Sequence, residues 1–306
     1  MACEFEIVLL GDSEEHLRQV AELALEEIGR LDHQLSYFDR TSDVSFLNAE
    51  AWTRPIPVEP GLFGLLKLAQ ELWLETDGAF DVTSAPLVDL WREAERTGSE
   101  PSAGAICSAL ASVGMNHVVL DDLINSVRLD GDGVRISLGA IGKGYAVDCV
   151  AGILREYEVE SALVSAGRSS IRAFGNQPGG PGWTVGIRHP SNPDEHVTTV
   201  CLRDQAMATS GGVMQKDEAV EERFEHIIDP RTGQAAESGL ASVSVVAESG
   251  ALADALSTAF YLGGKSFAEA RCQDRAGVCA ILVEPDNVGC GFSVMRVSAN
   301  TGGIVP

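Results

Sequence analysis

The chain has 306 residues, of which 45% are apolar and 22% are charged, and this length suits one large domain or two closely packed ones. The formal net charge is −23 and no block of Lys or Arg stands out, which argues against nucleic acid or anionic lipid as a partner. No apolar run approaches the roughly 18 residues of a spanning helix, so no membrane span is expected.

The first third of the chain is predicted to hold one strand followed by long helices. Residues 4–11 begin with alternating apolar and polar side chains, which is typical of a strand. Residues 13–35 carry apolar side chains at helical spacing, and Ser13 is a suitable N-cap. A second helix is expected over 60–78, where it ends on a glycine, and the polar residues 92–104 are expected to form a loop.

Short strands dominate from about residue 117 onward, with helices expected at 143–156 and at about 249–262. Helices therefore gather early and strands late, without the regular alternation of a doubly wound sheet, which favours an α+β fold. The expected strands are HVVL (117–120), VRISL (134–138), SALVSAG (161–167), WTVGI (183–187), VTTVCL (197–202), SVSVVA (242–247), GVCAILVE (277–284) and FSVMRV (292–297).

The cysteines and the first residues bear on the compartment. The seven cysteines include no CxxC pair, which favours buried small side chains in a reducing compartment over disulfides. The opening MACEFEIVLLGD has no basic region and no small-residue cleavage site. A cytoplasmic location is expected for the chain as given, and an exported or periplasmic one if an N-terminal signal has been removed.

The stretch SGALADALSTAFYLGG (249–264) places two oxygen donors on one helix face. Asp254 and Thr258 are four residues apart, so a helix brings them to the same side. A carboxylate and a hydroxyl are hard donors that suit Mg²⁺ or Ca²⁺. The alternative is an Asp with local polar bonds and a Thr packed within the helix.

The stretch RISLGAIGKGYAVD (135–148) leads from an expected strand through a glycine-rich turn into a helix. Its glycines let the backbone approach a ligand closely, and a helix N-terminus beside Lys143 suits phosphate. The spacing matches neither standard nucleotide-binding fingerprint. A tight strand–helix connection with a surface lysine is the alternative.

The stretch TDGAFDVTSAPLVDLW (76–91) sets an aromatic ring beside a carboxylate. Phe80 and Asp81 together could stack on a flat heterocycle and hydrogen-bond to it. The alternative is an Asx turn with the phenylalanine in the core.

The stretch HIIDPRTG (226–233) concentrates polar groups in a short turn after an acidic run. A neutral His226 could act as a general base, and Arg231 could bind phosphate. Alternatively, the turn chemistry of Asp229 and Pro230 simply holds the loop.

Taken together, these stretches occur in the order expected of one known family. The sequence resembles the FAD:protein FMN transferases, the ApbE family, over about residues 1–285. The stretches that carry the resemblance are LSYFDRTSDVSFLNA, DGAFDVTSAPLVDLW, LGAIGKGYAVD, HIIDPRTG and ADALSTAFYLG.

The resemblance implies a fold and an activity. The implied fold is α+β with mixed, largely antiparallel sheets flanked by helices, as one domain over residues 1–306 or as two closely packed subdomains. The implied activity is Mg²⁺-dependent cleavage of the FAD diphosphate and attachment of FMN to a Thr or Ser of an acceptor protein that carries a flavinylation motif. An FAD diphosphatase that yields FMN and AMP, or a weakly active FAD-binding protein, is the alternative.

The resemblance also implies roles for individual residues. Mg²⁺ would be held by the backbone carbonyl of Ala140, the carboxylate of Asp254 and the hydroxyl of Thr258. His226 would lie near the reacting phosphate as a candidate base for the incoming hydroxyl. The implied FAD contacts are Met1, Tyr37, Ala79, Phe80, Asp81, Ser137, Lys143 and Ile228.

The chain departs from the family pattern at several of these positions. Ser137 stands where an aspartate usually precedes the glycine-rich motif, and Arg168, Ser169 and Ser170 replace the usual Gly-Gly-Asp. Ser210 and Gly211 lack the tyrosine that usually follows them. The implied site therefore has fewer carboxylates than the family pattern.

Overall fold

The computed structural model describes residues 3–211, 227–286 and 291–299. The chain divides into two compact units. Of the described residues, unit 1 comprises 32–140 and 227–236, and unit 2 comprises 3–31, 141–211, 237–286 and 291–299. The expected organisation, one domain or two closely packed subdomains, stays a prediction.

Unit 2 is built on a 7-stranded sheet in the order β1-β5-β6-β9-β10-β11-β12. Every neighbouring pair in this sheet is antiparallel, which confirms the expected α+β class with antiparallel strands. The strands are β1 (Phe5–Leu10), β5 (Ser161–Ala166), β6 (Ser170–Phe174), β9 (Gln205–Gly211), β10 (Ser242–Ala247), β11 (Cys279–Pro285) and β12 (Phe292–Ser298).

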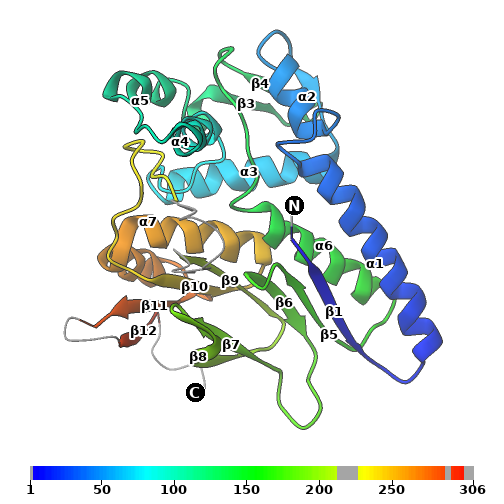
Figure 1. Ribbon diagram of the computed structural model, residues 1–306. Helices are drawn as coiled ribbons and strands as arrows, with labels where there is room; N and C mark the ends of the chain where they lie inside the picture. The colour runs from blue at the N-terminus through cyan, green and yellow to red at the C-terminus, as the bar shows by residue number, and fades with distance from the viewer. Residues whose placement is uncertain (1–2, 212–226, 287–290, 300–306) are drawn as a thin grey trace. The chain divides into compact units, whose positions relative to one another are not determined.

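Helices cover one face of this sheet and a long hairpin covers the other (Figure 1). The helices are α6 (Gly142–Glu156), α7 (Gly250–Asp274) and the first part of α1 (Glu14–Leu35). The hairpin is formed by β7 (Trp183–His189) and β8 (Asn192–Leu202). One apolar cluster lies between α1, α6 and β5, and a second lies between the hairpin and the strands.

The alternation of side chains along each strand sorts residues between these two faces. Ile171 and Ala173 of β6 and Met207 of β9 belong to the hairpin-side cluster. Their neighbours therefore face the helices, as the contacts of Ser210 in β9 with side chains of α7 show. The Ser210 hydroxyl therefore lies on the sheet face that the helices cover, where it contacts α7.

Two glycines let helices α6 and α7 cross at backbone contact. A Cβ at Gly144 would lie 2.0 Å from the carbonyl oxygen of Gly250, and a Cβ at Gly250 would lie 2.4 Å from the carbonyl oxygen of Gly144. No side chain fits at either position. The N-terminal turns of both helices therefore meet, and polar groups on them come together.

Unit 1 contains the remaining helices and a 3-stranded sheet in the order β2-β4-β3. Its largest buried side chains include Phe80, Leu62 and Leu66. Its elements are the end of α1, α2 (Asp43–Glu50), β2 (Ile56–Pro57), α3 (Pro60–Glu75), α4 (Ala85–Thr97), α5 (Ala103–Leu110), a 3₁₀ turn (Met115–His117), β3 (Val118–Asp121) and β4 (Ser126–Leu129).

The prediction of a loop over residues 92–104 is wrong, because most of this segment is helical. Helix α4 runs to Thr97 and ends where Gly98 adopts a φ of 66°, and α5 begins at Ala103. The polar run is the solvated side of α4, as the ion pair between Arg96 and Glu93 three residues earlier illustrates. Charged residues at this density fit an exposed helix as well as a loop.

The strand expected over 134–138 is also wrong. This segment belongs to no strand, and the amide of Asn48 bonds its backbone instead: Asn48 Nδ2 donates to the carbonyl oxygen of Ile136 at 2.9 Å, and Asn48 Oδ1 accepts from Ile136 N at 2.7 Å. Apolar periodicity indicates that alternate side chains are buried, but it does not indicate which groups form hydrogen bonds with the backbone.

Two helices end at other residues than expected, because local hydrogen bonds and backbone conformation set their ends. The helix expected to end at Gly78 ends at Glu75, and Gly78 N then donates to the carbonyl oxygen of Trp73 at 2.9 Å. The helix expected to end near 262 continues as α7 to Asp274, across non-helical backbone at Gly264. The expected strand at 4–11 and the helix capped by Ser13 are confirmed.

The expectations about membrane spans and cysteines can be compared with the described residues only. No helix among them is long and apolar enough to cross a membrane. The six cysteines among them are all free thiols, and the expected burial is found for Cys272 and Cys279, whereas Cys107 is exposed and the other three are partly exposed.

Candidate functional site

Asp254 is a buried carboxylate where α6 and α7 cross in unit 2. Helix α7 begins after Ser249, whose hydroxyl accepts from Leu252 N at 3.2 Å, and Asp254 lies in the following turn. Its side chain accepts from Gly144 N at 3.0 Å through Oδ2, and its Oδ1 lies 3.9 Å from Lys143 Nζ. The predicted residues Lys143 and Asp254 are thus neighbours.

Thr258 lies one turn farther along α7, on the same side as Asp254. Its Oγ1 lies 3.3 Å from the carbonyl oxygen of Asp254 and 3.1 Å from the hydroxyl of Ser210 on β9. Ser257 adds a further hydroxyl, 2.8 Å from that of Ser210. Sequence reasoning identified Thr258 but missed Ser257, which stands beside Thr258 and three residues after Asp254.

The donor set at this crossing suits a hard divalent cation. One buried carboxylate and a threonine hydroxyl are oxygen ligands of the kind Mg²⁺ takes, and Mg²⁺ keeps other positions for water and phosphate oxygens. Within the described ranges no three His, Cys, Asp or Glu side chains gather as a metal cluster, so a site here would rely on a single carboxylate. Ala140 belongs to unit 1, and its carbonyl stays a predicted ligand.

A second carboxylate fixes the start of α7. Asp148 of α6 accepts from Gly250 N at 2.7 Å and from Ala251 N at 3.0 Å. Arg172 of β6 approaches it from the sheet, with Nε 3.8 Å from Oδ1. Burial raises the pKa of Asp148 above its ordinary value, against the lowering effect of these two backbone donors.

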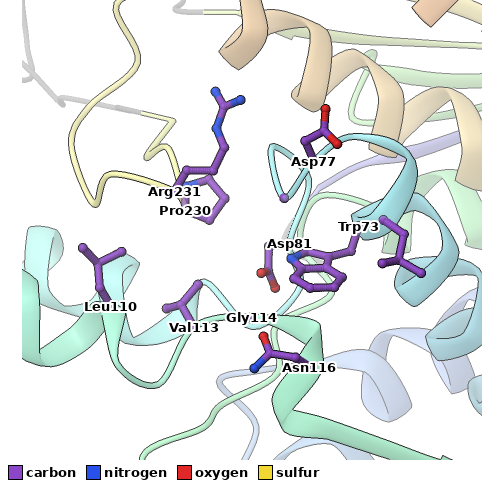
Figure 2. Close-up of a pocket in the computed structure, with 11 residues that line it drawn as sticks. Trp73, Asp77, Asp81, Leu110, Val113, Gly114, Asn116, Pro230 and Arg231 are labelled. Carbon is purple, nitrogen blue, oxygen red and sulfur yellow. The ribbon is translucent and has the colours of Figure 1, made fainter.

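Unit 1 holds a pocket of about 480 Å³ between two stretches that the sequence singled out. Figure 2 shows Pro230 and Arg231 on one side of it, across from Trp73 and Asp81. The lining residues are Trp73, Leu74, Asp77, Gly78, Asp81, Leu110, Val113, Gly114, Asn116, Pro230 and Arg231. The structure therefore brings the 76–91 stretch and the loop of residues 227–233 to one cavity, although they are far apart in the sequence.

Asp81 is a buried carboxylate at the wall of this pocket. Its Oδ1 accepts from Thr83 N at 2.7 Å and from Thr83 Oγ1 at 2.5 Å, which is the Asx turn foreseen as the alternative. Burial raises the pKa of Asp81 to about 6, although its hydrogen bonds oppose this shift. The group is therefore partly protonated near neutral pH.

The loop of residues 227–233 is held by its own turn chemistry. Asp229 receives the guanidinium of Arg231 through two oxygens, with Nη2 to Oδ2 at 2.7 Å and Nε to Oδ1 at 2.9 Å. Its carbonyl accepts from Gly233 N at 2.8 Å, and Trp91 Nε1 donates to the Gly233 carbonyl at 2.8 Å. Arg231 thus carries a carboxylate partner, which weakens its candidacy as a phosphate ligand.

The other predicted FAD contacts are distributed over unit 1. Phe80 is 1% exposed, so its ring is part of the core, and its backbone N donates to Thr76 Oγ1 at 3.1 Å. Tyr37 donates its hydroxyl to Asp89 at 2.5 Å, and burial followed by this bond raises the pKa of Tyr37. Ala79 and Ile228 are buried, and Ser137 N donates to the carbonyl oxygen of Val82 at 2.7 Å. Met1 and His226 lie outside the described residues, and their roles stay predictions.

The departures at 168–170 form the turn between β5 and β6. Arg168 is exposed and has a φ of 58°, a backbone conformation that residues other than glycine rarely adopt. Ser170 begins β6 and is fully buried. The structure gives no reason for an arginine at this turn.

Comparison with known proteins identifies the family. The model of the ApbE family matches residues 1–282. The chain belongs to the ApbE family. Among curated relatives, the "FAD:protein FMN transferase" of Treponema pallidum is 32% identical over 297 residues, which cover 91% of this chain and 80% of the relative. The protein of the same name from Klebsiella pneumoniae is 30% identical over 269 residues, covering 88% of this chain and 83% of the relative.

Solved ApbE structures share the fold. The "Flavin Transferase ApbE from Vibrio cholerae" superposes with a TM-score of 0.81 at 27% identity, covering 98% of this chain and 95% of that one. The ApbE protein from Thermotoga maritima gives a TM-score of 0.81 at 29% identity, covering 96% of this chain and 97% of that one. The ApbE-like architecture expected from the sequence is therefore confirmed.

Proposed function

We propose that this ApbE family protein is a Mg²⁺-dependent FAD:protein FMN transferase. The observation that carries the proposal is the similarity to relatives named FAD:protein FMN transferase along about nine-tenths of the chain. The arrangement of Asp254, Thr258 and Lys143 supports it, because two oxygen donors and a cationic group suit a metal and a diphosphate. The proposed substrates are FAD and an acceptor protein that carries a flavinylation motif.

The proposed transfer has a simple balance of bonds. The hydroxyl oxygen of an acceptor Thr or Ser bonds to the phosphorus on the FMN side of the diphosphate. The bond from that phosphorus to the bridging oxygen breaks, and AMP leaves with its electron pair. His226 is the proposed base that takes the proton of the hydroxyl.

The residues at the α6–α7 crossing have distinct proposed tasks. Asp254 and Thr258, with the carbonyl of Ala140, would hold Mg²⁺, which supplies charge neutralisation and polarisation of the phosphoryl oxygens when bound. Gly144 N fixes Asp254 by donating to Oδ2 at 3.0 Å. Lys143 brings positive charge close to Asp254, and a chain of net charge −23 needs such local reversal to admit an anionic dinucleotide.

Product analysis tests the proposal directly. Purified protein is incubated with FAD and Mg²⁺, with and without an acceptor that carries the stretch Asp-Gly-x-Thr/Ser-Gly-Ala-Thr/Ser. We expect flavin fluorescence to stay with the acceptor in a denaturing gel, with one AMP released for each flavin attached. FMN and AMP formed at the same rate without acceptor would indicate a diphosphatase, and intact bound FAD would indicate a binding protein.

Asp254→Asn tests the metal site in the same assay. The substitution keeps the shape of the side chain and removes its charge, so we expect the Mg²⁺-dependent turnover of FAD to fall by at least about tenfold at limiting Mg²⁺. Asp122→Asn is the control, because Asp122 pairs with Lys67 on the surface of unit 1. Equal turnover of Asp254→Asn and the unaltered protein at limiting Mg²⁺ would remove Asp254 from the site.

His226→Ala tests the proposed base. We expect FMN transfer to slow by about 10²–10⁴-fold while FAD binding, measured by flavin fluorescence, changes little. Weak FAD binding combined with normal transfer at saturating FAD would instead show that the loop only clamps the nucleotide.

A further inference from the structure

Two serine hydroxyls beside Thr258 form a hydrogen-bonded chain that ends on the backbone of Asp254. Ser257 Oγ donates to the carbonyl oxygen of Asp254 at 2.9 Å. Ser210 Oγ lies 2.8 Å from Ser257 Oγ and 3.1 Å from Thr258 Oγ1. Ser257 is fully buried, and these groups all belong to unit 2.

Three protons serve four contacts among these groups, so only three of the contacts can be ordinary hydrogen bonds at one time. A hydroxyl has one proton to donate and two lone pairs to accept with. A carbonyl oxygen only accepts, so in one arrangement Ser257 donates its proton to the Asp254 carbonyl and accepts from Ser210. Ser210 has then used its own proton, and it accepts from Thr258. In the other arrangement Thr258 donates to the Asp254 carbonyl at 3.3 Å, Ser210 donates to Thr258, and Ser257 donates to Ser210. In both arrangements the Thr258 proton points into the protein.

This direction decides what Thr258 can offer to a ligand. With its proton committed to the protein interior, the hydroxyl presents lone pairs at its remaining positions. Such an oxygen attracts a cation and repels the oxygens of a phosphate. A Thr258 hydroxyl turned the opposite way would direct its proton at the cation.

We propose that Ser210 and Ser257 are positioning residues that hold the hydroxyl of Thr258 in the orientation required to bind a divalent cation. The inference rests on the proposed function, in which Asp254 and Thr258 hold Mg²⁺. It assigns the two serines a role in metal affinity, beyond the satisfaction of each other's hydrogen bonds. Residues that orient a metal ligand commonly change metal affinity by about 10–100-fold when they are removed.

The test measures Mn²⁺ binding to the purified full chain without FAD, by the electron paramagnetic resonance signal of the free ion. We expect Ser210→Ala to weaken Mn²⁺ binding by about 10–100-fold, because Thr258 loses the neighbouring hydroxyl that fixes its orientation. Ser257→Ala should give a smaller loss, because Ser210 then has a proton free to donate to Thr258. Ser210→Thr keeps a hydroxyl on the strand and should restore most of the affinity.

The matched control removes a similar hydroxyl from the opposite face of the same sheet. Thr209 is the neighbour of Ser210 in β9, and its Oγ1 lies 2.7 Å from Ser244 Oγ on β10. Ser244→Ala also breaks a hydroxyl pair, but on the face away from α7. We expect this variant to bind Mn²⁺ as the unaltered protein does.

Activity gives a second measurement that a purely structural role would not produce. In Ser210→Ala we expect the Mg²⁺ concentration for half-maximal turnover to rise about as much as the Mn²⁺ affinity falls, while kcat at saturating Mg²⁺ recovers. Circular dichroism checks the fold of each variant. If Ser210→Ala does not fold, Ser210→Cys keeps the volume with a weak acceptor and is judged by the same criterion.

Two outcomes would overturn the inference in distinguishable ways. Unchanged Mn²⁺ affinity in Ser210→Ala and Ser257→Ala, beside a loss in Thr258→Val, would refute the serine roles and leave the proposed function standing. Unchanged affinity in both Thr258→Val and Asp254→Asn would refute the metal site, and the serine roles with it.

Discussion

Gly233 shows how a single residue fixes the loop that borders the pocket of unit 1. Its φ is 70°, and a Cβ there would lie 2.5 Å from Ile106 Cγ2 and 3.0 Å from Leu87 Cδ2. The loop therefore approaches α4 and α5 so closely that neither the backbone conformation nor the space admits a side chain. Pro230 and Arg231 reach the pocket wall because Gly233 makes this approach possible.

Gly233→Ala should destabilise the protein through both effects. Gly239 is a matched control, because its φ is 73° but nothing lies within 4 Å of its Cβ position. We expect Gly233→Ala to lower the free energy of unfolding by about 1–3 kcal/mol more than Gly239→Ala does, since only the first adds overpacking. Urea denaturation of both variants measures the difference, and equal losses would show that strain alone acts at residue 233.

At the scale of secondary-structure elements, the crossing of α6 and α7 organises the candidate metal site. The crossing brings Gly144 N to Asp254, and it brings Asp148 to the first N–H groups of α7. A carboxylate that accepts these N–H groups is also favoured by the positive end of the helix dipole. The same contact thus joins the two helices and aligns the carboxylate proposed to bind Mg²⁺.

Gly144→Ala should separate the helices. The added methyl would lie 2.0 Å from a backbone oxygen that cannot rotate away, so we expect a loss of about 3 kcal/mol or more in the free energy of unfolding. Gly152→Ala on the same helix is the control, because its Cβ meets nothing within 4 Å, and it should gain about 0.5–1 kcal/mol. Thermal unfolding followed by circular dichroism compares them. A Gly144→Ala protein as stable as the Gly152→Ala protein would contradict the close crossing.

For the stability of the whole molecule and its dependence on pH, the location of the charged groups matters more than the net charge. The net charge is −23, yet many ion pairs of the described residues lie on exposed helix surfaces and contribute little stability. The carboxylates that matter for pH are the buried ones. Asp81 in unit 1 and Asp148 in unit 2 both have pKa values raised by burial, so both are protonated more readily in the folded protein than in the unfolded chain.

Through Asp81, the stability of the protein should therefore rise toward acid pH. Its pKa of about 6 in the folded protein exceeds the roughly 3.9 of an unfolded chain, a difference worth about 3 kcal/mol. The folded state takes up this proton first, so stability increases as the pH falls from about 7 through 6 toward 4. We expect the free energy of unfolding of the unaltered protein to gain up to about 3 kcal/mol over that of Asp81→Asn across this range.

Urea denaturation of both proteins at several pH values measures this gain. The amide introduced by Asp81→Asn keeps an oxygen for the Thr83 bonds, so the comparison isolates the charge. Parallel pH profiles of the two proteins would show that Asp81 titrates at its ordinary pKa.

The amino-acid sequence by itself determined the family, the α+β class and most of the element positions. Apolar periodicity depends on which side chains are buried, so it located β1, α1, α6 and most strands of the large sheet. The motifs also pointed to Asp254, Thr258 and Lys143, because an i, i+4 pair on a helix and a lysine at a helix start are local features.

Only the tertiary structure decided what those residues contact. Periodicity does not tell whether an extended segment pairs with a strand or with the side chain of Asn48, and it does not tell a solvated helix from a polar loop. The chain of hydroxyls from Thr258 through Ser210 to Ser257 joins β9 to α7, which are far apart in sequence. Such contacts are set by packing, because the close approach at Gly144 and Gly250 fixes which groups of two distant segments meet.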